Sequence, residues 1–142
     1  LDLDKTFELL ETLKISRLGF KTNYMPGFWY YNTNKKVDHN FTNINELINY
    51  LKIRNHIDQT GSVLIFNPVP KNKSIDEKLI KKWINFSIDK AKINSIKGKE
   101  LTPFLIKEIN KLSKNKTLEA NIELIINNAA LAGKLAYNFY NS

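Results

Sequence analysis

The 142-residue sequence contains no cysteine, and its only arginines are Arg17 and Arg54. Without cysteine, the chain has no disulfides, no thiolate nucleophile and no Cys-ligated metal, a composition that fits a reducing compartment without identifying one. No apolar run approaches the roughly 18 residues that cross a bilayer. The acidic, amphipathic start at Leu1–Asp4 is not a signal peptide. We therefore expect no membrane partner.

The chain nevertheless carries a formal net charge of +8. Its basic residues are almost all lysines that are spread along the chain, whereas proteins that read nucleic acids rely on arginine for bidentate contacts. We interpret the charge as a solvated surface and expect no nucleic-acid partner. A basic RNA-binding module is the alternative, and it would bind RNA with a steep salt dependence.

The sequence opens on Leu1 rather than methionine. We therefore expect the chain to belong to a longer domain. No internal repeat or linker is visible, so we expect residues 1–142 to form one unit within it. The pattern of apolar residues predicts strands in the first half, alternating with helices, and a mainly helical second half. The fold class expected is α/β, with a sheet covered by helices in three α/β/α layers.

Local signals predict where these elements begin and end. We expect helix N-caps at Asp4, Thr42 or Asn43, Ser74, Thr102 and Thr117. We expect strands at 17–20, 28–31 and 62–67, and a loop at 32–40. The unbroken apolar run Val63–Phe66 predicts an interior strand that is buried on both faces.

Most catalytic signatures are absent from the sequence. It has no nucleophile elbow, no phosphate-binding P-loop, no zinc-protease motif and no dinucleotide fingerprint. His39 and His56 have no second histidine or carboxylate at ligand spacing, so we expect structural or surface roles for both. No metal ligand is predicted in this chain.

Two asparagine-containing stretches and one lysine remain as candidates. Asn67 follows the predicted central strand, at the end where ligands bind in α/β sheets, although it could equally satisfy the backbone of the strand exit. Lys99 precedes a predicted helix N-terminus and could hold a phosphate, although an ordinary loop explains it too. Asn121 and Asn128 are seven residues apart, so they lie on nearly the same face of the last predicted helix. A further candidate is the stretch Met25–Tyr30, whose aromatic side chains could stack on a base or belong to the core.

These stretches, in this order, resemble the pseudouridine-5′-phosphate glycosidases of the indigoidine synthase A-like family. The resemblance is carried by Leu1-Asp2, Leu10-Glu11-Thr12, Gly19-Phe20, Met25-Pro26-Gly27-Phe28, Asn67-Pro68-Val69-Pro70, Gly98-Lys99-Glu100-Leu101-Thr102-Pro103-Phe104-Leu105, Thr117-Leu118-Glu119-Ala120-Asn121-Ile122 and Asn127-Asn128-Ala129. Three positions depart mildly from the family pattern, namely Phe20, Met25-Pro26-Gly27-Phe28 and Thr117. The resemblance implies a homotrimer with a helix-covered mixed sheet.

The resemblance also implies a reaction, the reversible cleavage of the carbon–carbon glycosidic bond of pseudouridine 5′-phosphate to uracil and ribose 5-phosphate. The implied route opens the ribose ring and forms a Schiff base with a lysine, which supplies an electron sink. Manganese is the implied cofactor of the intact enzyme, and its ligand is not expected in this chain.

The resemblance places the Schiff-base lysine three residues before the position of Leu1. It places the acidic residue that acts as general acid, the lysine that binds the phosphate and the aspartate that binds the metal further upstream. It assigns a catalytic role here only to Asn121, and Asn67, Lys99 and Asn128 are the residues we expect to bind substrate. The isolated chain is therefore expected to be inactive. A family member kept for assembly rather than catalysis is the second alternative.

Overall fold

The computed structural model describes residues 2–57 and 61–141. The elements follow the order α1 (Leu3–Thr12), β1 (Ser16–Phe20), β2 (His39–Phe41), α2 (Ile44–His56), β3 (Val63–Phe66), the 3-10 turn η1 (Lys71–Lys73), α3 (Glu77–Ile93), the 3-10 turn η2 (Gly98–Glu100), α4 (Leu101–Leu112) and α5 (Lys116–Asn141). Strands lie in the first half and the second half is helical, so the predicted α/β class is confirmed. Leu1, part of the first family motif, lies outside the described residues.

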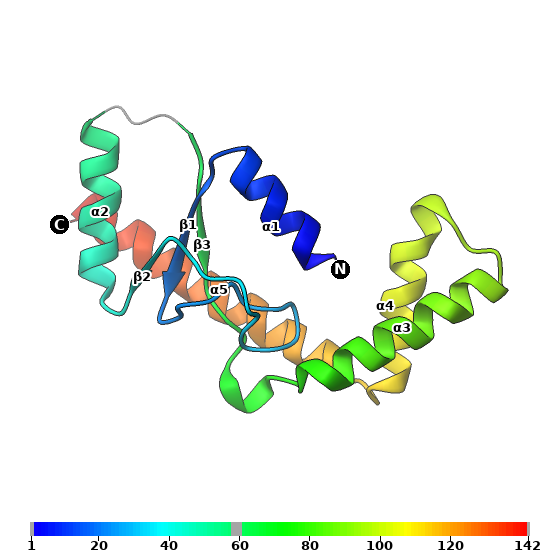
Figure 1. Ribbon diagram of the computed structural model, residues 1–142. Coiled ribbons are helices and arrows are strands. Elements are labelled where there is room, and N and C mark those ends of the chain that lie inside the picture. The colour runs from blue at the N-terminus through cyan, green and yellow to red at the C-terminus, as the bar shows by residue number, and fades with distance from the viewer. Residues whose placement is uncertain (1, 58–60, 142) are drawn as a thin grey trace.

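The three strands form one parallel sheet in the order β2-β1-β3. Figure 1 shows α5 running past this sheet, with α2 on one side and the α3–α4 hairpin extending away on the other. Gly19 in the central strand comes so close to the following turn that a Cβ there would lie 2.0 Å from the Thr22 carbonyl oxygen. Only glycine fits this approach, so the turn after β1 depends on it.

The prediction that Val63–Phe66 is an interior strand buried on both faces is wrong for this chain. β1, not β3, is the central strand, and β3 lies at an edge of the described sheet. Leu64 is 37% exposed and the other three residues of β3 are partly buried. A run of apolar residues indicates that these side chains favour burial. It does not indicate which neighbouring strands and helices are present to bury them.

The predicted strand at residues 28–31 is also wrong. This segment is irregular, and its backbone is held by the segment before α3 instead of by a strand. The Ile75 N–H donates to the Trp29 carbonyl at 2.8 Å, and the Tyr31 N–H donates to the Ser74 hydroxyl at 2.9 Å. Two of its aromatic side chains, Trp29 and Tyr30, are still buried in the main core cluster, whereas Phe28 is 49% exposed.

The predicted loop at 32–40 ends in a strand, because β2 begins at His39. Several predicted caps are displaced as well. Asn43 caps α2 as expected, but α1 begins after Asp2 and α3 after Asp76, whose carboxylates accept the backbone N–H groups of Lys5 and Leu79.

Thr102 and Thr117 lie inside the first turns of α4 and α5 instead of capping them. The Ser74 hydroxyl is already the acceptor for Tyr31, and that bond explains why Asp76 takes the capping role in its place.

Two apolar clusters hold these elements together. The larger cluster joins the irregular segment to α3, α4 and α5 through residues such as Trp29, Ile80 and Ile109. The smaller cluster is formed by Leu18, Phe41 and Leu47, and it packs β1 and β2 against α2. None of the described helices is long and apolar enough to cross a membrane.

Candidate active-site groove

A groove of about 440 Å³ lies between the irregular aromatic segment, α4 and the first turns of α5. We call it the α4–α5 groove. It is lined by Trp29, Thr102, Pro103, Ile106, Lys107, Asn110, Thr117, Leu118 and Asn121. Three stretches that the sequence singled out separately, at 25–30, 98–104 and 117–122, therefore meet at one cavity. Its size falls in the range of small-molecule sites, and its walls are mainly apolar.

Two buried polar atoms at this groove have no hydrogen-bond partner among the described residues, namely the indole Nε1 of Trp29 and Oδ1 of Asn121. Trp29 is only 2% exposed, so solvent does not satisfy its N–H group. Other polar groups of the groove are satisfied. The Thr117 hydroxyl lies 2.9 Å from that of Ser113, and the Asn110 amide donates to Asn115 at 3.0 Å. Unsatisfied buried groups are rare in folded proteins, so these two atoms set the groove residues Trp29 and Asn121 apart from their neighbours.

A buried ion cluster fixes the helix that forms one wall of the groove. Glu108 on α4 is 6% exposed, and its carboxylate accepts from Lys90 of α3 and from Lys111 of α4. The hydrogen bond from Lys90, assisted by that from Lys111, lowers the pKa of Glu108 below its ordinary value. The bond from Lys90 ties α4 to α3, although the two lysine side chains remain 44% and 62% exposed.

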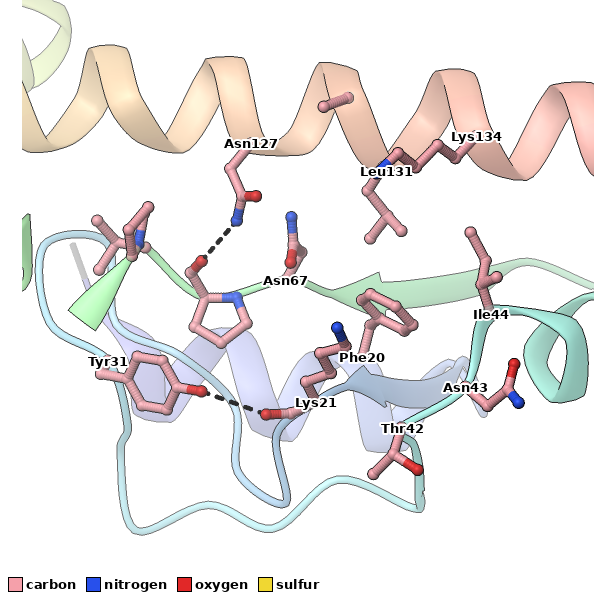
Figure 2. A pocket seen from close by; sticks show the side chains of 14 residues that line it. Phe20, Lys21, Tyr31, Thr42, Asn43, Ile44, Asn67, Asn127, Leu131 and Lys134 are labelled. Atoms are coloured by element: carbon pink, nitrogen blue, oxygen red, sulfur yellow. Dashed lines mark hydrogen bonds between the residues drawn. The ribbon is translucent and has the colours of Figure 1, made fainter. Parts of the chain in front are cut away.

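A second cavity of about 660 Å³ lies at the carboxyl ends of the strands, and we call it the sheet-end cleft. Figure 2 shows Phe20 at the end of β1 with Lys21 after it, Thr42 and Asn43 after β2, and Asn67 after β3 on one side. Asn127, Leu131 and Lys134 of α5 lie on the other side. The position of Asn67 at a strand exit that borders a cavity is as the sequence predicted.

Asn67 and Asn128, two of the predicted substrate-binding residues, contact each other. The Asn67 amide nitrogen donates to Oδ1 of Asn128 at 3.1 Å. The neighbouring Asn127 donates to the Pro68 carbonyl at 3.1 Å, a bond that Figure 2 marks with a dashed line. The Asn-Pro-Val-Pro and Asn-Asn-Ala motifs thus form a paired connection between the exit of β3 and the middle of α5. This contact uses the amide nitrogen of Asn67 and the amide oxygen of Asn128. The Asn67 oxygen and the Asn128 nitrogen are available to bind a further partner.

The structure does not bring the four predicted site residues into one cavity. Asn121 lines the α4–α5 groove, Asn67 lines the sheet-end cleft, and Asn128 is an exposed neighbour of the cleft. Lys99 is exposed in η2, on the turn between α3 and α4, which Figure 1 places at the end of the hairpin that points away from α5. Lys99 still precedes the first turn of α4, whose Thr102 and Pro103 line the groove.

Sequence reasoning missed Trp29 as a polar group and did not consider Lys107, the cation that lines the groove. The sequence analysis considered only stacking or core packing of the aromatic rings. The unusual feature in the structure is the indole N–H of Trp29, which is buried without a partner among the described residues. Lys107 had no signal in the sequence, since it is one of many lysines whose position is set only by the packing of α4 on α5.

The residues at 2–57 and 61–141 contain no group of three or more histidine, aspartate or glutamate side chains that could hold a metal ion. The described part of the chain therefore does not by itself supply a manganese centre.

Comparison with known proteins agrees with the geometry. Residues 1–138 match the model of the family described as indigoidine synthase A like protein. This chain belongs to that family. It is 40% identical over 139 residues to a pseudouridine-5′-phosphate glycosidase of Petrotoga mobilis, covering 98% of this chain and 45% of the relative. It is 34% identical to the enzyme of the same name from Brachyspira hyodysenteriae, covering 99% of this chain and 46% of that protein. The chain thus spans just under half the length of these curated relatives.

Solved structures show the same fold. An indigoidine synthase A-like protein from Thermotoga maritima superposes with a TM-score of 0.81 at 32% identity, over 96% of this chain and 44% of the other. A prealnumycin C-glycosynthase in complex with ribulose 5-phosphate superposes with a TM-score of 0.89 at 21% identity, over 98% of this chain and 46% of the other. The second likeness supports the fold alone.

Proposed function

We propose that the full-length protein is a pseudouridine-5′-phosphate glycosidase and that this chain supplies the part of its active site that contacts the base. The observation that carries the proposal is the α4–α5 groove, where two family motifs, Gly98–Leu105 and Thr117–Ile122, meet beside Trp29 around the Asn121 side chain. The printed names of the curated relatives support the substrate, since they are pseudouridine-5′-phosphate glycosidases.

The reaction would break the bond between C1′ of ribose and C5 of uracil. A lysine outside this chain, bonded to C1′ of the opened sugar, would donate its nitrogen lone pair to form the Schiff base at C1′, while the electron pair of the broken bond leaves with the uracil ring, whose C5 finally takes up a proton. Negative charge then develops on the uracil ring. Asn121 is proposed to donate its amide N–H to a ring oxygen that gains this charge, so that it binds the transition state more tightly than the ground state. An amide can do so without bringing a competing charge.

Other roles are proposed for residues around the two cavities. Lys99, next to the start of α4, would attract the substrate phosphate, helped by the exposed N–H groups of that helix. Asn67 would bind substrate through its amide oxygen and Asn128 through its amide nitrogen, the atoms that their mutual hydrogen bond does not use. Manganese in the intact enzyme is part of the proposal, with its ligand placed outside the described residues.

A homotrimer is likewise proposed, and one feature of α5 supports an assembly role. Several large apolar side chains on this helix are strongly exposed, among them Ile125 at 67% and Tyr137 at 70%. Contiguous exposed apolar surface is typical of protein contacts. The same feature favours the second candidate function, a family member retained for assembly without catalysis.

Uracil release by the full-length protein tests the proposal. Pseudouridine 5′-phosphate should yield uracil and ribose 5-phosphate in equal amounts, whereas uridine 5′-phosphate, with its carbon–nitrogen bond, should be cleaved far more slowly. The reverse reaction should consume uracil and ribose 5-phosphate together. A folded protein that cleaves neither nucleotide would contradict the glycosidase and favour the assembly role.

A further inference from the structure

Two buried side-chain atoms of the described residues have no hydrogen-bond partner, and they are complementary to each other. The Trp29 indole nitrogen can only donate, and Oδ1 of Asn121 can only accept. Both side chains line the α4–α5 groove, but both atoms are closed off from solvent, so a ligand that lies in the open groove does not reach them. A partner has to reach each atom from within the protein, and each is the kind of group that the other lacks.

The packing places the indole next to the stretch of α5 that carries Asn121. Trp29 shares a core cluster with Ala120, the residue before Asn121, and Leu124, one turn later, packs against the same cluster. The backbone of Trp29 is held in place, because its carbonyl accepts from the Ile75 N–H at 2.8 Å. The Asn121 side chain has two rotatable bonds, and no hydrogen bond to Oδ1 holds them. Asn121 is therefore the adjustable member of the pair.

The two ends of the Asn121 amide differ in their surroundings. The oxygen is buried without a partner, whereas the nitrogen is not among the buried unpartnered atoms of the described residues and is the end that can face the groove. The reversed amide would turn its N–H donors towards the indole donor, and both would then lack an acceptor. Donation from the Trp29 N–H to Oδ1 would therefore direct Nδ2 towards the occupant of the groove.

We propose that Trp29 is a positioning residue for Asn121, and that its indole N–H donates to Oδ1 of Asn121 once substrate is bound. This role rests on the proposed function, in which Nδ2 of the same amide donates to the uracil ring. In the structure both atoms are unpartnered, at a cost in free energy that the bond between them removes. The bond selects the orientation of Asn121 in which its N–H can stabilise the developing charge. Substrate binding and the orientation of Asn121 thereby become interdependent.

The first test observes the indole N–H by nuclear magnetic resonance. The full-length protein is labelled at the indole nitrogen of its tryptophans, and single tryptophan-to-phenylalanine changes assign the signals. A saturating equilibrium mixture of pseudouridine 5′-phosphate, uracil and ribose 5-phosphate should move the Trp29 proton downfield. The same mixture should slow exchange of that proton with solvent about tenfold, the effect expected of one added hydrogen bond. The Trp83 signal should not respond, since Trp83 does not line the groove.

Two variants of Asn121 show whether its oxygen is the acceptor. Asn121→Ala has no acceptor, so the Trp29 signal should no longer respond at concentrations that saturate the variant. Asn121→Asp keeps a side-chain oxygen but loses Nδ2, so the response should persist although turnover is lost. The two inactive variants thereby separate the indole contact from the reaction itself.

Turnover separates positioning from packing. Trp29→Phe keeps an aromatic ring but removes the N–H, so it should lower kcat about tenfold while KM stays within about twofold of the wild type. In an Asn121→Ala background the same change should lower kcat no further, because no amide is left to orient. Trp83→Phe makes the same chemical change at a core position outside the groove, and it should keep normal kcat.

The positioning role is overturned if the substrate mixture leaves the Trp29 signal unchanged, or if the signal responds equally in Asn121→Ala. It is also overturned if Trp29→Phe and Asn121→Ala lower kcat by factors that multiply, because Trp29 then acts through packing alone. The resonance measurements on the two Asn121 variants leave Trp29 unchanged, so they decide the contact even if Trp29→Phe does not fold.

These outcomes are separable from failure of the proposed function. Normal uracil release together with a Trp29 signal that never responds would remove the positioning role while leaving the glycosidase standing. Conversely, a response that requires the Asn121 oxygen, in a protein that does not cleave pseudouridine 5′-phosphate, would retain the contact and remove the reaction.

Discussion

Asn67, at the exit of β3, and Asn128, on α5, are 61 residues apart in sequence and hydrogen-bond to each other at 3.1 Å. Together with the bond from Asn127 to the Pro68 carbonyl at 3.1 Å, this contact fixes α5 against the end of the sheet. The same helix carries Asn121 two turns earlier. The connection therefore sets the position of α5 along the sheet, and with it where Asn121 stands in the groove.

The first prediction is that Asn67 and Asn128 are energetically coupled. In a double-mutant cycle with Asn67→Ala and Asn128→Ala, the free energies of unfolding should show a coupling of about 0.5–1 kcal/mol, because the contact is a single, largely exposed amide–amide bond. Urea denaturation of the four proteins measures it. Strictly additive effects would mean that the contact contributes nothing to stability. A rise in KM in either single variant would support the proposed contact with substrate.

The second prediction concerns Asn121. Asn121→Ala should lower kcat by about 10²–10³, the usual effect of removing one donor to a developing oxyanion. Asn121→Asp should be at least as damaging, since it places a negative charge beside the forming anion. Because Oδ1 has no partner among the described residues, neither variant loses a native hydrogen bond there, and thermal stability should change little.

Single-turnover rates and melting temperatures of the same two variants check this expectation. Asn128→Ala, on the same helix but engaged with Asn67, should keep kcat within a few-fold of the wild type. If Asn121→Ala melts much earlier but its folded fraction turns over normally, Asn121 is a structural residue and the groove is not the site of chemistry.

The third prediction concerns pH. The carboxylate of Glu108 has a pKa below its ordinary value, first because of the hydrogen bond from Lys90. A group whose pKa is depressed in the folded state contributes stability above its unfolded pKa and loses it as pH falls through the folded pKa. Stability should therefore decline below about pH 4.5, where an unfolded glutamate begins to bind protons.

Glu108→Gln, which cannot titrate, should be less stable than the wild type at neutral pH and should lose the difference as the pH falls through the depressed pKa of Glu108. Denaturant midpoints across this range measure it, and Glu123→Gln, a change on α5 outside the described ion pairs, serves as the control. A constant difference between wild type and Glu108→Gln at all pH values would show that the ion cluster does not drive the acid sensitivity.

The fourth prediction follows from the edge position of β3. Ile65→Ala should destabilise the fold by about 1–3 kcal/mol, because Ile65 packs on the cluster of Leu18, Phe41 and Leu47 but is only partly buried. Leu64→Ala should cost less, since Leu64 faces away and is 37% exposed. Equal costs for the two neighbours, measured by denaturant unfolding, would indicate that β3 is covered on both faces in the full-length protein.

Much of this architecture is predictable because local signals and tertiary packing agree. The helical periodicity of the second half, the cap at Asn43 and the strand at Arg17–Phe20 each depend on residues close in sequence, and all three appear as expected. The errors occur where two distant segments compete for one group. Ser74 could have capped α3, but its hydroxyl accepts from Tyr31, so Asp76 becomes the cap. β2 was missed because its three residues are held by pairing with β1 and have no apolar pattern of their own.

The sequence by itself determined the family and the α/β class, because an ordered set of short motifs carries both, and it singled out Asn67 and Asn121 as candidate site residues. Only the tertiary structure decided how those motifs combine. Asn67 pairs with Asn128 at the sheet end, whereas Asn121 faces a separate groove with Trp29. The physical reason is that hydrogen-bond satisfaction is a property of the packed molecule. Whether the Trp29 N–H finds an acceptor depends on how the aromatic segment packs against α4 and α5, and no local pattern in the chain encodes that contact.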